Sequence, residues 1–367
     1  MSTRRLQWLP VASAILLSQT ACSRDLEVLP EESCADHDSD AVVAFGDASL
    51  ESAIRGALSF GPEQRLTCDL MTIVSTLDAS GAGVGDLAGI QNLTELSFLV
   101  LAESSVTDLG PLGGLTALRS ITLDGSTNLS DIQPLLDNAE LGKHDLVYLR
   151  KTRASCGDVL ALATKGVGVR SDCVGWWPGE GSAADAFGDN DGTITGDVSF
   201  APGRLGQAFS FAGQGAYVRT LANVGVDGNQ PRTVAAWVKG GAPEGARCCA
   251  TPFSWGAAAG GGGFGSSVAE GVWSFWGYRD DTGTGVSVDT EWNHHVITYD
   301  ASVMRYYLNG ELVAEGRRAL NTTASPLYIG TGFDLRPNRQ FTGLVDELLV
   351  FNRAMDSADV RALYARY

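Results

Sequence analysis

Hydrophobic residues recur every 22 positions in the first half of the chain. Two sets of apolar residues follow this spacing: Leu77, Leu99 and Ile121, and, two positions later, Ala79, Leu101 and Leu123. Each unit holds one short strand-like run that cannot bury its leucines alone, so the units are expected to stack. The pattern predicts a short solenoid over residues 41–173, with a capping helix within residues 45–66 and a second cap at residues 153–173.

The hydrophobic pattern changes after residue 175. Short strand-like runs recur there between glycine-containing turns, and seven of the eight tryptophans lie in this part. Asn309-Gly310, between two such runs, is a strong signal for a type I′ hairpin turn. Residues 175–367 are therefore predicted to form a two-sheet antiparallel sandwich, and the chain as a whole is expected to be mainly β.

The N-terminus has the pattern of an export signal. Arg4 and Arg5 precede an apolar run at positions 9–17, and Cys22 follows a short stretch of small residues. This ending resembles a bacterial lipoprotein signal, in which the cysteine is lipidated. The sequence departs from the lipoprotein pattern at Gln19, where an aliphatic residue is usual, so ordinary signal-peptide cleavage remains the alternative.

The resemblance implies a membrane anchor at one end of the chain. Residues 1–22 would be the signal peptide and lipidation site, and the acidic residues 23–40 would be a tether. We expect an exported protein, held by its lipid anchor as an outer-membrane or cell-surface lipoprotein.

Composition narrows the class of protein and of partner. The chain has 367 residues, of which 44% are hydrophobic and 19% are charged, as in globular proteins. Its formal net charge of −17 repels phosphate backbones, so no nucleic-acid partner is expected.

The cysteines suggest disulfides, because an exported protein meets an oxidising compartment. Cys22 aside, six cysteines remain, and the expected pairs are Cys34–Cys68, Cys156–Cys173 and Cys248–Cys249. The last pair joins adjacent residues and would be a strained ring. Zinc is the alternative, but no CxxC pair or histidine stands at ligand spacing.

Each half resembles a known family. The repeats LTELSFLVLAESSVTDLGPLGG and LTALRSITLDGSTNLSDIQPLL resemble leucine-rich repeats of the internalin type, with Ser104 and Ser126 where asparagine is usual. The second half resembles the laminin-G-like, concanavalin A-like jelly roll. The marks of that family are WWPGEG, DNDGT, PGRLGQAFSFAGQGAYV, AAWVK, WNHHVITYD, YLNGELV, YIG and FTGLVDELLVFNRAM. The glycine-rich insertion GAAAGGGGFGSS departs from the family and puts its ligand specificity in doubt.

The resemblance to leucine-rich repeats implies that a partner would bind the concave face. Phe98 and Val100 flank a repeat leucine and are the predicted protein-contact residues. The alternative is that the short array is a spacer, or that these side chains pack within the chain.

Some jelly rolls of this class hold one calcium ion. Hard calcium prefers six to eight oxygen ligands, and Asp185, Asn190 and Asp346 are the candidate ligands here. The alternative is that Asp and Asn simply favour tight turns.

Aromatic side chains near the insertion could form a platform for sugar rings. Trp255, Phe264, Trp276 and Tyr278 are the candidates, although most of them are expected in the core because tryptophan is highly buried on average.

Catalysis is not expected. No GxSxG motif is present. Asp346-Glu347 could be a glycosidase pair, but neighbours on a strand face opposite ways, whereas a retaining mechanism needs two carboxyls about 5 Å apart. We therefore expect a non-catalytic recognition or adhesion protein whose jelly-roll loops bind a glycan, with calcium as a candidate cofactor. The rival is a protein-contact module that binds a surface protein, and a polysaccharide-active enzyme is the third class.

Overall fold

A computed structural model of the chain describes residues 27–213, 215–241 and 249–367. The signal peptide, the lipidation site at Cys22 and the pairing of Cys248 with Cys249 involve residues outside these ranges. No helix in the described ranges is long and apolar enough to cross a membrane.

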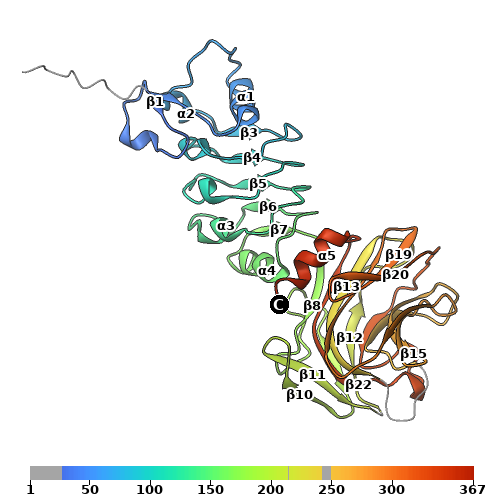
Figure 1. Cartoon of the computed structure of the whole chain (residues 1–367). Coiled ribbons are helices and arrows are strands. Elements are labelled where there is room, and N and C mark those ends of the chain that lie inside the picture. Colours follow the sequence, from blue (N-terminus) through green and yellow to red (C-terminus); the bar gives the residue numbers. More distant parts are fainter. Residues whose placement is uncertain (1–26, 214, 242–248) are drawn as a thin grey trace, which may run out of the picture.

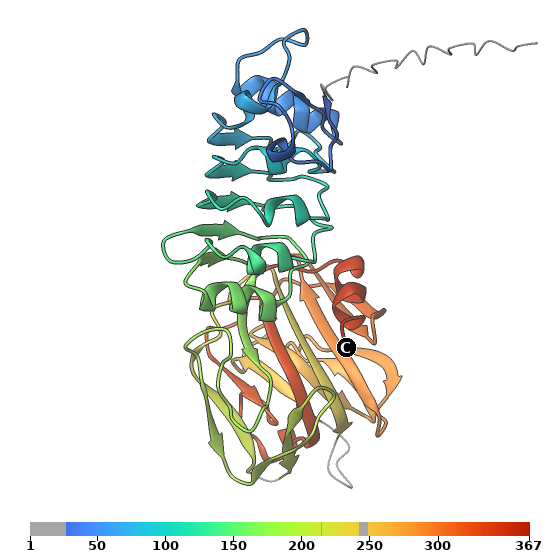
Figure 2. The same cartoon turned by 90° about the vertical axis from the view of Figure 1, so that its left-hand side faces the viewer.

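The 22-residue period is the repeat of a parallel sheet. Its strands pair in chain order: β3 (Thr76–Asp78), β4 (Phe98–Val100), β5 (Ser120–Thr122), β6 (Leu146–Tyr148) and β7 (Gly168–Arg170). Leu77, Leu99 and Ile121 lie opposite one another in register, and each is buried. The strands form a stack whose turns follow one another along one axis (Figures 1 and 2).

Short helical segments close the other side of the stack. They are α2 (Cys68–Met71), η2 (Ile90–Asn92), η3 (Gly110–Leu112), α3 (Gln133–Asp137) and α4 (Cys156–Thr164). The apolar residues of strands and helical segments form one continuous core. Ser104 and Ser126 stack inside it through a 2.8 Å hydrogen bond between their hydroxyls.

The N-terminal cap is larger than the sequence analysis suggested. β1 (Glu27–Val28) pairs in parallel with β2 (Val42–Val43), and Val28 is fully buried. The short helix η1 (Cys34–Asp36) is joined to α2 by the Cys34–Cys68 disulfide. The prediction of a tether is therefore wrong for residues 27–40, because Val28 is buried and Cys34 is bonded to the cap. Helix α1 (Ala48–Ala57) is the predicted capping helix, with Asp47 as its N-cap.

The second half is a sandwich of two antiparallel sheets. One sheet contains, within the described ranges, β8 (Cys173–Trp177), β10 (Val198–Pro202), β11 (Gln207–Ala212), β13 (Arg232–Gly241), β18 (Trp292–Tyr299), β19 (Val303–Leu308), β20 (Glu311–Arg317) and β22 (Thr342–Phe351). The other contains β9 (Gly192–Thr195), β12 (Tyr217–Asn223), β14 (Phe253–Gly256), β15 (Gly263–Ala269), β16 (Val272–Phe275), β17 (Thr282–Ser287) and β21 (Pro326–Ile329). A core rich in aromatic residues lies between the sheets. Asn309 and Gly310 both have positive φ, at 50° and 84°, which confirms the predicted turn between β19 and β20.

The stack and the sandwich are joined by a second, smaller apolar cluster. Helix α5 (Ser357–Tyr364) covers the outer face of the first sheet, and Cys156 of α4 joins the same cluster. The predicted Cys156–Cys173 disulfide links α4 to β8. Arg353, just after β22, pairs with Asp359 at 2.5 Å and with Asp172 at 3.0 Å. These contacts connect the end of the stack to the sandwich.

Candidate functional site

Three of the four predicted sugar-platform residues are buried, and two of them, Trp255 and Phe264, belong to the core between the sheets. Trp255 and Phe264 are 0% exposed and Trp276 is 2% exposed. The indole of Trp255 donates to the carbonyl of Val226 at 3.1 Å and packs 4.8 Å from the ring of Phe264. The assignment of Trp255 and Phe264 to an exposed platform is wrong, because strands β14 and β15 point these two rings into the core between the sheets. Tyr278 alone of the four is partly exposed.

An aromatic cluster does lie around Tyr278, on the loops at one end of the sandwich. Trp276 stacks on Phe333 with ring centres 4.3 Å apart and planes 6° apart. The Arg339 guanidinium lies 4.3 Å from the centre of the same indole. Tyr278 lies beside both rings, at 6.5 Å from Trp276 and 6.3 Å from Phe333. We call Trp276, Tyr278, Phe333 and Arg339 the rim cluster.

Charged groups border the rim cluster. The Asp334 carboxylate faces Arg336 at 3.3 Å and Arg339 at 3.4 Å. The Arg336 side chain is 58% exposed, so its donors reach solvent. The cluster therefore offers partly exposed rings beside an exposed cation, Arg336, which the buried Asp334 carboxylate holds in place.

The backbone beneath Tyr278 is unusual. Tyr278 and Arg279 both adopt left-handed φ angles, of 56° and 62°. Bulky residues rarely occupy this region, and such residues cluster at ligand-binding sites. The sequence analysis missed Phe333, Arg336 and Arg339, because they lie on the loop after β21 and carry no motif.

The predicted calcium ligands serve as turn acceptors. The Asp185 carboxylate accepts backbone N–H groups from Trp176 at 2.9 Å, Phe187 at 3.0 Å and Asn190 at 3.4 Å. Asp346 instead accepts N–H groups from another loop, so the three candidates have no shared partner. Among the described residues, no group of three His, Cys, Asp or Glu side chains could hold a metal ion.

Asp346 and Glu347 share one face of β22, contrary to the expected alternation. Val345 and Leu348 both point into the sandwich core, so the two residues between them both face outward. On β13, Ala235 and Trp237 are two positions apart, but their partners Leu349 and Asp346 are three apart. This is a β-bulge, in which Glu347 is the extra residue and has a left-handed φ of 52°.

Both carboxyl groups are buried, at 0% exposed for Asp346 and 3% for Glu347. Asp346 Oδ2 accepts from the backbone N–H of Arg204 at 2.7 Å and Leu205 at 3.0 Å, while its buried Oδ1 has no partner among the described residues. Burial raises the pKa of Asp346 to about 6. The pair is too deeply covered for a polysaccharide chain to reach it.

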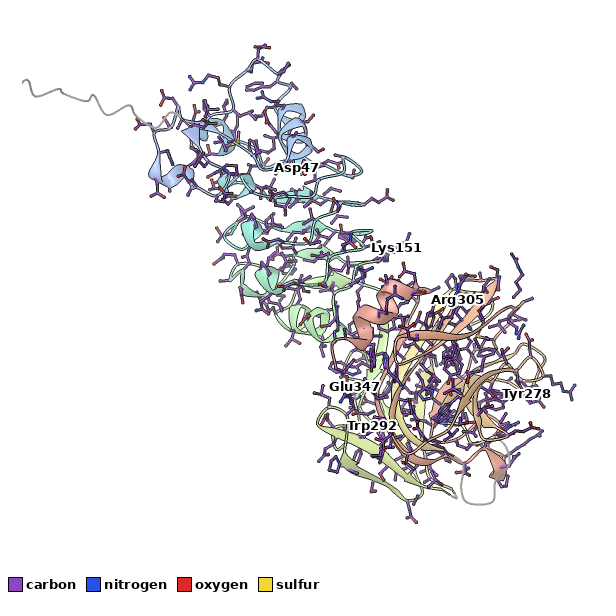
Figure 3. All side chains as sticks on the ribbon, viewed as in Figure 1. Asp47, Lys151, Tyr278, Trp292, Arg305 and Glu347 are labelled. Carbon is purple, nitrogen blue, oxygen red and sulfur yellow. A yellow bond between two sulfur atoms is a disulfide. The ribbon has the colours of Figure 1, made fainter. Side chains whose placement is uncertain are left out.

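Glu347 lies under two aromatic donors. Its Oε2 accepts from the Trp176 indole at 3.1 Å and from the Tyr367 hydroxyl at 3.0 Å. Burial raises the pKa of Glu347 to about 7, because these hydrogen bonds only partly offset the loss of water and the neighbouring charge of Asp346 adds to it. Glu347 and Tyr278 lie at opposite sides of the sandwich (Figure 3).

The predicted protein-contact residues lie on the open face of the parallel sheet. Phe98 is 51% exposed, and Val100 is half-buried. Phe98 pairs with Ser120, which in turn pairs with Leu146, and Leu146 is 38% exposed. The face thus carries two exposed apolar side chains separated by one polar strand position.

The sandwich has the architecture of a known superfamily. Residues 212–361 match the family model of the concanavalin A-like lectin/glucanases superfamily. This concanavalin A-like domain includes β12 to β22 and most of α5. No curated protein matches the chain.

Several solved structures resemble part of this chain. Domain 4 of AbnA, a GH43 extracellular arabinanase from Geobacillus stearothermophilus solved with arabinotriose, is 22% identical, with a TM-score of 0.44 over 53% of this chain and 98% of that domain. The binding domain of Paraclostridial Mosquitocidal Protein 1 is 14% identical with a TM-score of 0.42. A botulinum neurotoxin type C structure, described with two ganglioside molecules, is 12% identical with a TM-score of 0.42. The match covers 53% of this chain and about half of each toxin chain, 52% and 51%. At these identities the similarity concerns the fold and not the ligand.

Proposed function

We propose that the chain is a non-catalytic, surface-anchored recognition protein whose rim cluster binds carbohydrate. The observation that supports this most directly is the partly exposed pair Tyr278 and Phe333, backed by the buried Trp276, on which the half-buried Arg339 packs. The site lies on loops held by two rigid sheets, where binding residues are most often found.

The chemistry of the rim cluster suits a sugar ring. An aromatic face packs against the apolar C–H face of a pyranose, and the backing indole holds that face in place. Arg336 can donate to hydroxyl oxygens, and Asp334, whose carboxylate is buried, holds Arg336 and Arg339 in place. No step of bond cleavage is proposed, because the Asp346–Glu347 pair is buried away from these loops.

A glycan array followed by calorimetry on the best ligand tests this proposal. We expect Tyr278→Ala and Phe333→Ala each to weaken binding at least tenfold, since stacking on an aromatic ring contributes about 1–3 kcal/mol. Phe98→Ala is the matched control, because it removes an exposed ring from the other half of the chain. Unchanged affinity in both rim variants would exclude the rim cluster as the sugar site.

We also propose that residues 41–173 are an internalin-like leucine-rich-repeat solenoid and that Cys22 is lipidated. The first proposal is supported by the parallel strands in 22-residue register and the buried Ser104–Ser126 ladder. The second is supported by the sequence around Cys22 alone. Mass spectrometry of the exported protein tests it, since Cys22→Ser should remove the mass of the acyl chains.

A second candidate function is protein contact through the open face of the parallel sheet. The exposure of Phe98 and Leu146 favours it. In that case Phe98→Ala would abolish capture of a surface protein and leave glycan binding intact, the reverse of the rim variants.

A further inference from the structure

A cavity of about 520 Å³ lies where the stack, β22 and α5 meet. Its volume is within the range of pockets that hold small organic ligands. Apolar side chains from all three elements line most of it, among them Leu149, Val159, Leu349, Met355 and Leu363. The cavity is on the side of the sandwich that carries Glu347, away from the rim cluster (Figure 3).

The positive charges in the cavity wall already have partners. Arg153 pairs with Asp359 at 2.9 Å, and Arg353 pairs with the same carboxylate and with Asp172. Arg366 is exposed and donates to the carbonyl of Arg153. An anionic ligand would therefore have to displace an existing ion pair, which disfavours that class of ligand.

Glu347 is the buried carboxyl group of this wall that lacks a counter-ion, whereas Asp131 and Asp158, which also line it, are exposed and half-buried. Glu347 is only 3% exposed. No arginine or lysine of the described ranges forms an ion pair with its carboxyl group. Oε2 holds both of its hydrogen bonds, and Oε1 receives none from the described residues. A buried carboxylate without a counter-ion is costly, so a cation placed against Oε1 would be strongly favoured.

Aromatic side chains surround the same part of the cavity. Trp176 and Tyr367, which hold Oε2, both line the cavity, and Phe351 lies in the wall two strand positions beyond Leu349. Aromatic rings next to a carboxylate attract organic cations through their π faces. A metal ion fits less well, because no set of three ligands is available in the described part of the chain.

We propose that this cavity binds an organic ammonium ion, with Glu347 as its counter-ion and its apolar portion among the lining side chains. The proposal is independent of sugar binding at the rim cluster, because the two sites share no residue. It adds a small-molecule site to a protein otherwise proposed to bind glycans.

The test uses the full exported chain and two probes of nearly equal shape. Choline carries the ammonium charge, and 3,3-dimethylbutan-1-ol replaces its nitrogen by carbon. Calorimetry and the fluorescence of the tryptophans, of which Trp176 lies in the wall, report binding. At pH 8, where the Glu347 carboxyl is ionised, we expect choline to bind at least tenfold more tightly than the neutral alcohol, because only choline pairs with Glu347.

Two variants separate this site from a general loss of structure. Glu347→Gln keeps the side-chain shape and should reduce choline affinity at least tenfold while leaving the weak binding of the alcohol unchanged. Ala362→Phe places a ring in the cavity and should abolish binding of both probes. Glu311→Gln, the same chemical change at an exposed position of β20, is the control and should change neither.

The proposal is overturned by either of two results in folded protein. One is equal binding, or no binding, of choline and the alcohol to the native chain at millimolar concentration. The other is undiminished choline affinity in Glu347→Gln. A melting curve close to that of the native chain establishes that each variant is folded.

Discussion

The stack and the sandwich bury apolar residues by different rules. In the stack, each strand contacts only its neighbours in the sequence, so Leu77, Leu99 and Ile121 meet because they are 22 residues apart. In the sandwich, β13 pairs with β22 across about a hundred residues, and no period marks the pairing. A local repeat therefore allows the buried residues to be predicted from the sequence. In a sheet with long-range pairing, the sequence alone does not show which aromatic residues face solvent.

The largest effect should come from the core of the sandwich. Phe264→Ala should lower the free energy of unfolding by about 3–5 kcal/mol, because it leaves a large cavity among buried rings. Tyr278→Ala, at the partly exposed rim, should cost less than about 1 kcal/mol. Chemical denaturation measures both. Equal losses would mean that the distinction between core and rim aromatics does not hold.

The next effect concerns the stack. Replacing Cys34 and Cys68 by serine should destabilise the N-terminal cap by about 2–4 kcal/mol, because the disulfide closes a loop with a sequence separation of 34 residues. Hydrogen exchange should show the loss in α1 and α2 while β13 and β22 stay protected. Faster exchange throughout the sandwich would show that the two halves unfold as one unit.

A smaller effect should appear with pH at the contact between the halves. Because the folded pKa of Glu347 is raised to about 7, its stabilising contribution is present below its ordinary pKa of 4.5 and is lost as the pH rises through 7. Between pH 5 and pH 8 the native chain should lose about 2 kcal/mol relative to Glu347→Gln. Asp346, Glu180, Trp176 and Tyr367 are the groups that act on this carboxyl.

The comparison with Glu347→Gln removes the titration of the buried histidines from the result. Burial lowers the pKa of His294 and of His295 to about 3, so both destabilise the native chain as the pH falls below about 6.5. The variant retains both histidines, and their contribution cancels in the difference. Parallel stability curves for the two proteins over pH 5–8 would contradict the assignment to Glu347.

The smallest effect should come from calcium. We expect millimolar calcium to shift the melting temperature by less than about 1 °C, because the Asp185 carboxylate already accepts three backbone N–H groups and the described ranges hold no group of three ligands for a metal. Asp185→Asn and the control Asp197→Asn, on the turn before β10, should respond alike. A larger shift that is lost in Asp185→Asn alone would contradict the reading of Asp185 as a turn acceptor.

Sequence reasoning reached the elements that depend on local pattern. The 22-residue spacing predicted the strands of the stack, and turn chemistry predicted the Asn309-Gly310 turn. The expected pairing of the cysteines predicted the Cys34–Cys68 and Cys156–Cys173 disulfides. The sandwich was identified from the order of its motifs rather than from any period.

The candidate sites were harder to predict, for two physical reasons. The exposure of Trp255 and Phe264 depends on which strands pair, and pairing across the sheet is not written in the local pattern. The alternation rule assigned Asp346 and Glu347 to opposite faces, and the rule fails at a bulge. Phe333 and Arg339 approach Trp276 only after a loop has folded back across the sheet.

The bulge at Glu347 also shifts the alternation of inward-facing and outward-facing residues along β22 by one position. Before it, odd-numbered Val345 faces inward, and after it, odd-numbered Leu349 and Phe351 face outward toward α5 and the stack. Deletion of Glu347 would restore simple alternation and leave Leu348 facing inward and Leu349 and Phe351 facing outward, because the extra residue is what shifts the register here. The consequence of the extra residue is that two consecutive carboxyl groups, Asp346 and Glu347, face outward where simple alternation would allow one.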